Sequence, residues 1–85
     1  MEQIQRIQYM ETLLDEITAG LDTGEYASLE SKVRELADYY EGPLWRADYE
    51  SDENGLLPPG LKRGVLSEDG IYNVLLDYEQ LTGKI

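Results

Sequence analysis

A series of apolar residues spaced alternately by three and four positions most constrains how this chain can fold. The series begins at Tyr26 and ends at Tyr40, and polar residues such as Arg34 and Asp38 occupy positions between its members. Because a helix turns by about 100° per residue, this spacing places the apolar side chains along one stripe. The segment is therefore predicted to be an amphipathic helix that packs through Tyr26, Leu29, Val33, Leu36 and Tyr40.

The preceding segment shows the same periodicity over residues 2–19 and is predicted to be the first helix. Gly20 and Gly24 interrupt the pattern and are expected to end this helix. Between them, Asp22 is followed three residues later by Glu25, which resembles a capping box for the start of the second helix.

Two more helices are predicted from their end signals. Gly42 and Pro43 end the second helix, and a proline at the first helical position favours a short third helix over residues 43–52. Ser67 is predicted to cap a last helix, which Gly83 follows.

The connection before the last helix combines turn residues with apolar ones. Pro58, Pro59 and Gly60 remove helix donors and favour turns. We expect this segment to fold across the open end of the helices as a lid loop, and also to cover a second apolar face of the last helix at Tyr72 and Leu76. The alternative is that another subunit or a partner covers that face. The apolar lid residues are Leu56, Leu57, Leu61, Val65 and Leu66.

These elements predict an all-α fold, namely a compact antiparallel bundle of three longer helices and one short helix with an apolar lid loop. The 85 residues suffice for one domain, assigned to residues 1–85. A domain of this length buries only about 60% of its unfolded surface, which leaves little room for a deep catalytic cavity beside a core.

The charge and composition argue against several classes of function. Eighteen acidic residues against seven basic ones give a net charge of −11, so we expect no direct binding to nucleic acid or to an anionic membrane. The chain has no histidine and no cysteine, and these are the commonest acid–base and metal-binding groups. We therefore expect no enzymatic activity. The absence of a long apolar run and of a signal-peptide start predicts a cytoplasmic protein.

One segment partly matches a calcium-binding loop. Acidic and amide side chains over residues 50–54, followed by Gly55, have the early spacing of such a loop. The match fails at Leu61, which stands where a glutamate should complete the ligands, so neither a metal nor another cofactor is expected.

The residues best suited to binding a partner lie on and near the short helix. Trp45, Arg46 and Tyr49 belong to the residue types most enriched at binding hot spots. The competing interpretation is that Trp45 anchors the core, while Arg46 and Asp48 tie the short helix to its neighbours.

Lys62 and Arg63 form the only adjacent basic pair, suited to a partner's carboxylate or phosphate. Alternatively, they offset the nearby Glu68 and Asp69. The leading hypothesis is a protein–protein interaction module whose surface comprises Trp45, Arg46, Asp48, Tyr49, Lys62, Arg63, Tyr72 and Leu76.

Two other functions remain open. The acidic residues Asp38, Glu41, Asp48, Glu50, Asp52 and Glu53 form the densest negative cluster, and such a cluster on a helix can imitate the phosphates of a nucleic acid. This favours an inhibitor of a nucleic-acid enzyme, of the kind a phage uses against a host nuclease. A structural homodimer without a separate ligand is the third hypothesis.

The chain carries three motifs, WRADYE at residues 45–50, GLLP at residues 55–58 and LKRGVLSEDGIY at residues 61–72. In these motifs it resembles a family of short acidic bacterial proteins that is catalogued as a domain of unknown function. The resemblance implies a small helical protein of bacterial or phage origin and supplies no catalytic residue, cofactor or partner. Gly70 stands where a better helix former is expected, which predicts a loose start to the last helix.

Overall fold

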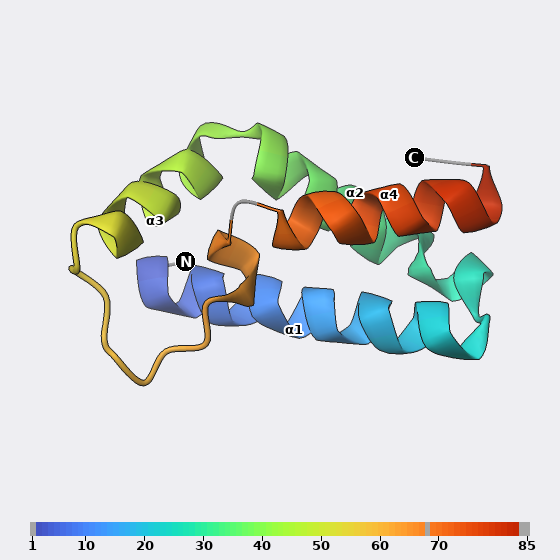
Figure 1. Cartoon of the computed structure of the whole chain (residues 1–85), viewed down its shortest axis with the longest axis horizontal. Coiled ribbons are helices and arrows are strands. Elements are labelled where there is room, and N and C mark those ends of the chain that lie inside the picture. Colours follow the sequence, from blue (N-terminus) through green and yellow to red (C-terminus); the bar gives the residue numbers. More distant parts are fainter. Residues whose placement is uncertain (1, 68, 84–85) are drawn as a thin grey trace.

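The computed structural model describes residues 2–67 and 69–83. Over these residues it contains four α-helices, two short 3₁₀ turns and no strand (Figure 1). The elements are α1 (Gln3–Thr23), the turn η1 (Tyr26–Leu29), α2 (Glu30–Glu41), α3 (Pro43–Glu53), the turn η2 (Gly64–Leu66) and α4 (Gly70–Thr82). None of the helices in these ranges combines the length and the apolar character that crossing a bilayer requires.

Three helices form the body of the bundle. α1, α2 and α4 pack against one another, and α2 runs in the opposite direction to the other two (Figure 1). α1 and α4 run in the same direction, because α3 and the lid loop carry the chain back to the end where α1 begins. The turn η2 at the end of the lid contacts α1, α3 and α4. The predicted all-α bundle is thus confirmed, with α1 and α4 as a parallel pair within it.

The first helix is longer than predicted. α1 continues through Gly20 to Thr23 and ends at Gly24, whose φ of 79° is the left-handed conformation that glycine adopts readily. Gly20 serves packing instead, since a Cβ there would lie 2.7 Å from Cδ2 of the buried Leu29. The proposed capping box is wrong, because Asp22 lies inside α1 and the chain re-enters helix through η1 without a side-chain cap.

Two residues at the start of α4, Ser67 and Gly70, each have a structural role there. The N-cap position of α4 is Asp69 rather than Ser67 as predicted, but the Ser67 hydroxyl still accepts a hydrogen bond from the N–H of Gly70, the first helical residue, at 3.0 Å. A Cβ on Gly70 would lie only 2.5 Å from the Gly64 carbonyl oxygen. The close approach of η2 to the first residue of α4 therefore requires glycine at position 70.

The lid loop closes the core as predicted, except at its start. Leu57, Val65 and Leu66 are buried and Leu61 packs against the core, whereas Leu56 is 72% exposed. The buried carboxylate of Glu11 on α1 accepts the Val65 N–H at 3.0 Å, which fixes η2 to α1. The core cluster beneath comprises Ile7, Leu14, Ile17, Leu29, Val33, Leu36, Tyr39, Leu57, Val65, Leu66, Ile71, Leu75 and Tyr78.

Candidate interaction surface

Asp48, assigned from the sequence to the interaction surface and to the acidic patch, is fully buried. Arg6 on α1 binds its carboxylate with two nitrogens, Nε to Oδ2 at 2.9 Å and Nη2 to Oδ1 at 2.5 Å. The Tyr39 hydroxyl donates to Oδ2 at 2.7 Å, and the Gln3 amide donates to Oδ1 at 3.0 Å. Both predicted roles of Asp48 are therefore wrong, and the interpretation that it ties the short helix to its neighbours is confirmed.

The surroundings of this carboxylate shift the pKa values of the groups around it. Burial by itself would raise the pKa of Asp48, but the hydrogen bonds from Arg6, Tyr39 and Gln3 outweigh burial and lower it. Burial, followed by the hydrogen bond to Asp48, raises the pKa of Tyr39. Asp48 is thus held ionised inside the protein by a complete set of donors, which is the arrangement of a structural buried ion pair.

The basic pair Lys62 and Arg63 is engaged within the chain. Arg63 donates to Asp52 at 2.7 Å, to the Pro58 carbonyl at 2.5 Å and to a second lid carbonyl, that of Leu61, at 3.2 Å. These bonds hold the lid to the end of α3. The arginine is therefore part of the lid's own framework rather than a site for a partner.

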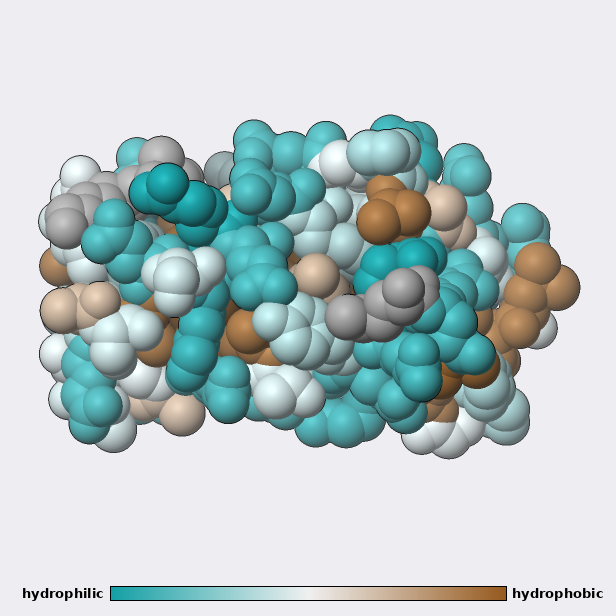
Figure 2. All heavy atoms as spheres, turned by 180° about the vertical axis from the view of Figure 1, so that it is seen from behind, coloured by the Kyte–Doolittle hydropathy of each residue, from teal (hydrophilic) through white to brown (hydrophobic). Residues whose placement is uncertain are grey.

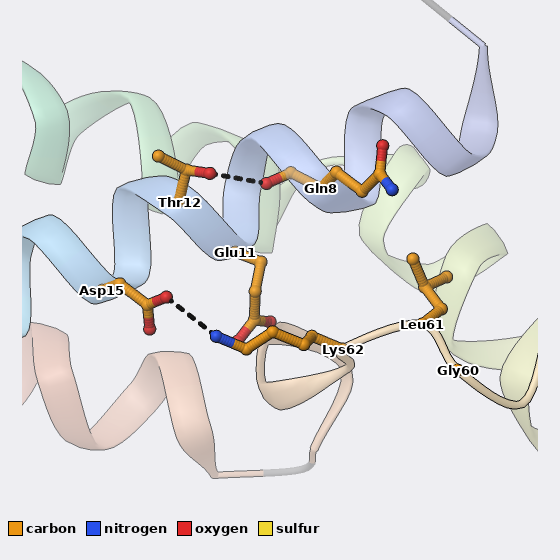
Figure 3. A pocket seen from close by; sticks show the side chains of 7 residues that line it. All are labelled: Gln8, Glu11, Thr12, Asp15, Gly60, Leu61 and Lys62. Atoms are coloured by element: carbon orange, nitrogen blue, oxygen red, sulfur yellow. Dashed lines mark hydrogen bonds and ion pairs between the residues drawn. The ribbon is translucent and has the colours of Figure 1, made fainter.

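Lys62 reaches α1 on the other side of the lid. Its Nζ lies 3.1 Å from Asp15 Oδ2, at the edge of a polar hollow between the lid and α1 that Gln8 and Thr12 also line (Figure 3). The expectation that this basic pair offsets Asp69 is wrong, since both members pair elsewhere. Glu68, the other acid expected there, lies outside the described residues.

An aromatic row crosses from α2 to α3. The Trp45 ring stacks on Tyr49 with centroids 5.1 Å apart and meets the edge of Tyr40 at 5.0 Å. Its indole Nε1 donates to the Val65 carbonyl at 2.8 Å, so Trp45 also anchors the lid and is only half-buried. Arg46 beside it is exposed and forms no ion pair with any residue that the structure describes.

Beyond Tyr40, a shallow groove separates α2 from α4. Tyr72 and Leu76 line its α4 side, and Tyr72 remains 53% exposed. The lid packs against the start of α4 through η2, but no lid residue lines this groove, so the prediction that the lid covers this face is wrong. The groove holds a hollow of about 240 Å³, lined by Ala37, Tyr40, Glu41, Tyr72, Leu75, Leu76 and Glu79.

Sequence reasoning found only part of this groove. The spacing on the last helix predicts Tyr72 and Leu76, but the spacing on α2 places Tyr40 on the packing seam and gives Ala37 no role. The signal that would have found them is spacing, because Ala37, Tyr40 and Glu41 follow a three- and four-residue pattern like that of Tyr72, Leu76 and Glu79.

The acidic patch is smaller than predicted. Asp38, Glu41, Glu50 and Glu53 are exposed, whereas Asp52 is held by Arg63 and Asp48 is buried. Figure 2 shows one face of the molecule covered mainly by hydrophilic residues, with apolar groups in small separate areas. Within the described ranges, no group of three or more acidic side chains is arranged to hold a metal ion.

The fold and its surface define a small acidic helical bundle with a half-buried aromatic row across α2 and α3 and an exposed tyrosine, Tyr72, on α4. The chain belongs to the family described as "Domain of unknown function (DUF4298)", whose model matches residues 1–85. No curated protein and no solved structure gives a significant match.

Proposed function

We propose that this protein is a protein–protein interaction module without catalytic activity, and that it binds its partner through the groove between α2 and α4. We call this surface the α2–α4 groove and define it by Ala37, Tyr40, Glu41, Tyr72, Leu75, Leu76 and Glu79. The observation that carries the proposal is the exposure of Tyr72 beside an open apolar hollow.

The energetics of binding favour this surface over the rest of the molecule. Tyrosine is among the residues that dominate binding energy, because it buries a large area while losing few rotatable bonds. Tyr72 is 53% exposed, and Leu76 beside it is half-buried. The row of Tyr40, Trp45 and Tyr49 extends the aromatic surface from the groove onto α3.

The test compares partner capture by three forms of the tagged protein in a bacterial lysate. These forms are the wild type, a groove variant carrying Tyr72→Ser with Leu76→Ser, and the control Leu56→Ser. Leu56 is more exposed than Tyr72 and lies at the start of the lid, just after α3 ends, so the control removes apolar surface elsewhere. Circular dichroism verifies that all three are folded.

We expect a discrete protein to be retained by the wild type and by Leu56→Ser and lost from the groove variant. Retention should survive high salt, because burial of apolar surface is not screened by ions. Equal retention of the same partner by all three forms would contradict the proposal.

Imitation of a nucleic acid is a second candidate, favoured by the exposed carboxylates Asp38, Glu41, Glu50 and Glu53. It predicts that nucleic-acid-binding proteins are captured and released as salt rises. It also predicts that Glu50→Gln with Glu53→Gln weakens capture more than the groove variant does.

A further inference from the structure

We infer that the α2–α4 groove receives a basic amphipathic helix of a partner protein, which inserts one large apolar side chain between Lys or Arg residues. This inference rests on the proposed function and adds the chemistry of the partner.

The shape of the groove favours a helix as the occupant. Two antiparallel helices form its walls, and their lining residues recur at three- and four-residue steps, at Ala37, Tyr40 and Glu41 on α2 and at Tyr72, Leu76 and Glu79 on α4. Grooves between two helices commonly accept an amphipathic helix that lays its apolar face into them.

The size of the hollow sets the number of inserted side chains. An enclosed cavity of about 150 Å³ accommodates a benzene ring. The open hollow here measures about 240 Å³ and has Tyr72 and Leu76 along one wall. It therefore has room for one large apolar side chain of the partner, such as leucine, phenylalanine or tryptophan.

The charge at the edge of the groove indicates which charged residues the partner should carry. Glu41 on α2 and Glu79 on α4 are both exposed, and neither forms an ion pair with another residue in the described part of the chain. The groove lining includes no lysine or arginine. A partner with Lys or Arg on both sides of its inserted side chain would complement the two carboxylates.

The same charges disfavour a second copy of this chain as the occupant. Two molecules that each carry a net charge of −11 repel each other, and each would bring acidic residues to the acidic edge of the other's groove. Of the six basic residues described, five already pair within their own chain, so a second copy could offer only Arg46 to the two carboxylates of the groove.

The experiment uses a phage-displayed library of random peptides, selected on the full-length protein. Selected peptides are then synthesised and titrated against four forms of the protein: wild type, Tyr72→Ser, Glu41→Gln with Glu79→Gln, and Leu56→Ser. The substituted side chains are all exposed, so each variant should keep the fold, and circular dichroism verifies this.

We expect the enriched peptides to carry Lys or Arg on both sides of a large apolar residue. Their affinity should fall about tenfold on Tyr72→Ser, a loss of about 1.4 kcal/mol, and stay unchanged on Leu56→Ser. The double glutamine variant should bind several-fold more weakly at low salt, with a smaller dependence on salt than the wild type.

Two results would overturn the inference in different ways. Peptides that depend on Tyr72 but lack basic residues would refute the basic partner while leaving the groove as a protein-binding surface. Peptides that bind all four forms equally, or no enrichment at all, would refute the groove itself and the proposed function with it.

Discussion

Arg6 and Asp48 lie 42 residues apart in the sequence and form a bidentate ion pair that joins α3 to the start of α1. The Asp48 carboxylate is fully buried, and Tyr39 of α2 donates to the same oxygen as Arg6 Nε. One carboxylate therefore joins α1, α2 and α3 and fixes the bend between α2 and α3.

Replacing this carboxylate should destabilise the protein strongly. Asp48→Asn removes the charge that compensates Arg6, and breaking a buried pair in this way costs about 3 kcal/mol. The matched control is Glu50→Gln on the exposed face of α3, which should change the free energy of unfolding by less than about 0.5 kcal/mol. Urea unfolding of both variants measures the difference, and equal stability of the two would show that the buried pair contributes little.

The difference in stability between wild type and Asp48→Asn should depend on pH. Because the pKa of Asp48 is lowered by folding, its stabilisation is fully present above the unfolded pKa of about 3.9 and is lost as pH falls through the folded value. The stability gap between wild type and Asp48→Asn should therefore be constant near neutral pH and narrow below about pH 4. A gap that widens with acid would contradict this assignment.

The contribution of Tyr39 to stability should be lost at high pH rather than at low pH. Its pKa is raised by burial and by the hydrogen bond to Asp48, so its stabilisation is present below the unfolded pKa of about 10 and is lost as pH rises above it. Tyr39→Phe should cost about 2 kcal/mol at neutral pH, the value of a hydrogen bond to a charged group. Thermal unfolding from pH 7 to 11 should then show a smaller loss of stability for Tyr39→Phe than for wild type.

Gly70 should resist replacement although alanine is the better helix former. Helix propensity alone favours alanine over glycine, by up to about 1 kcal/mol in a helix interior. The new Cβ would instead meet the Gly64 carbonyl oxygen at 2.5 Å, so we expect a loss of about 1–3 kcal/mol from the forced shift of η2. Gly60→Ala is the control, because a Cβ there would meet no heavy atom within 4 Å, and it should change the free energy of unfolding by less than about 0.5 kcal/mol. A stabilising Gly70→Ala would contradict the described contact.

The two basic residues of the lid should differ in importance. Lys62 pairs with Asp15 on the exposed surface, and such pairs contribute about 0–1 kcal/mol. Arg63 bonds two lid carbonyls and Asp52, so Arg63→Ala should cost about 1–2 kcal/mol and accelerate amide hydrogen exchange in residues 56–66. Equal effects of Lys62→Ala and Arg63→Ala would contradict this account of the lid.

The sequence was sufficient to predict the helices and most of the core, because apolar spacing and end signals are local. It was insufficient for Asp48, whose partners Gln3 and Arg6 are brought close only by the fold. The roles of Gly20 and Gly70 could not be predicted for the same reason. At each position a residue of another element approaches the backbone closely, and neither glycine ends a helix.

Only the α4 side of the groove could be predicted from the sequence. The second apolar face of α4 follows from spacing, which identified Tyr72 and Leu76. Spacing does not show whether the lid covers this face of α4. The position of the lid depends on the hydrogen bonds of Trp45 and Glu11 with the backbone of Val65. Glu11 itself carried a local signal, since it lies four residues after Ile7 on the buried stripe of α1.

Site-directed photo-crosslinking in bacterial cells tests whether the α2–α4 groove is the surface that binds a partner. Tyr72 is replaced by p-benzoylphenylalanine in one form of the protein and Leu56 in another, both positions being well exposed. We expect a discrete cross-linked protein at position 72 and none at position 56. Cross-linking at position 56 but not at position 72 would contradict the assignment of the α2–α4 groove as the binding surface.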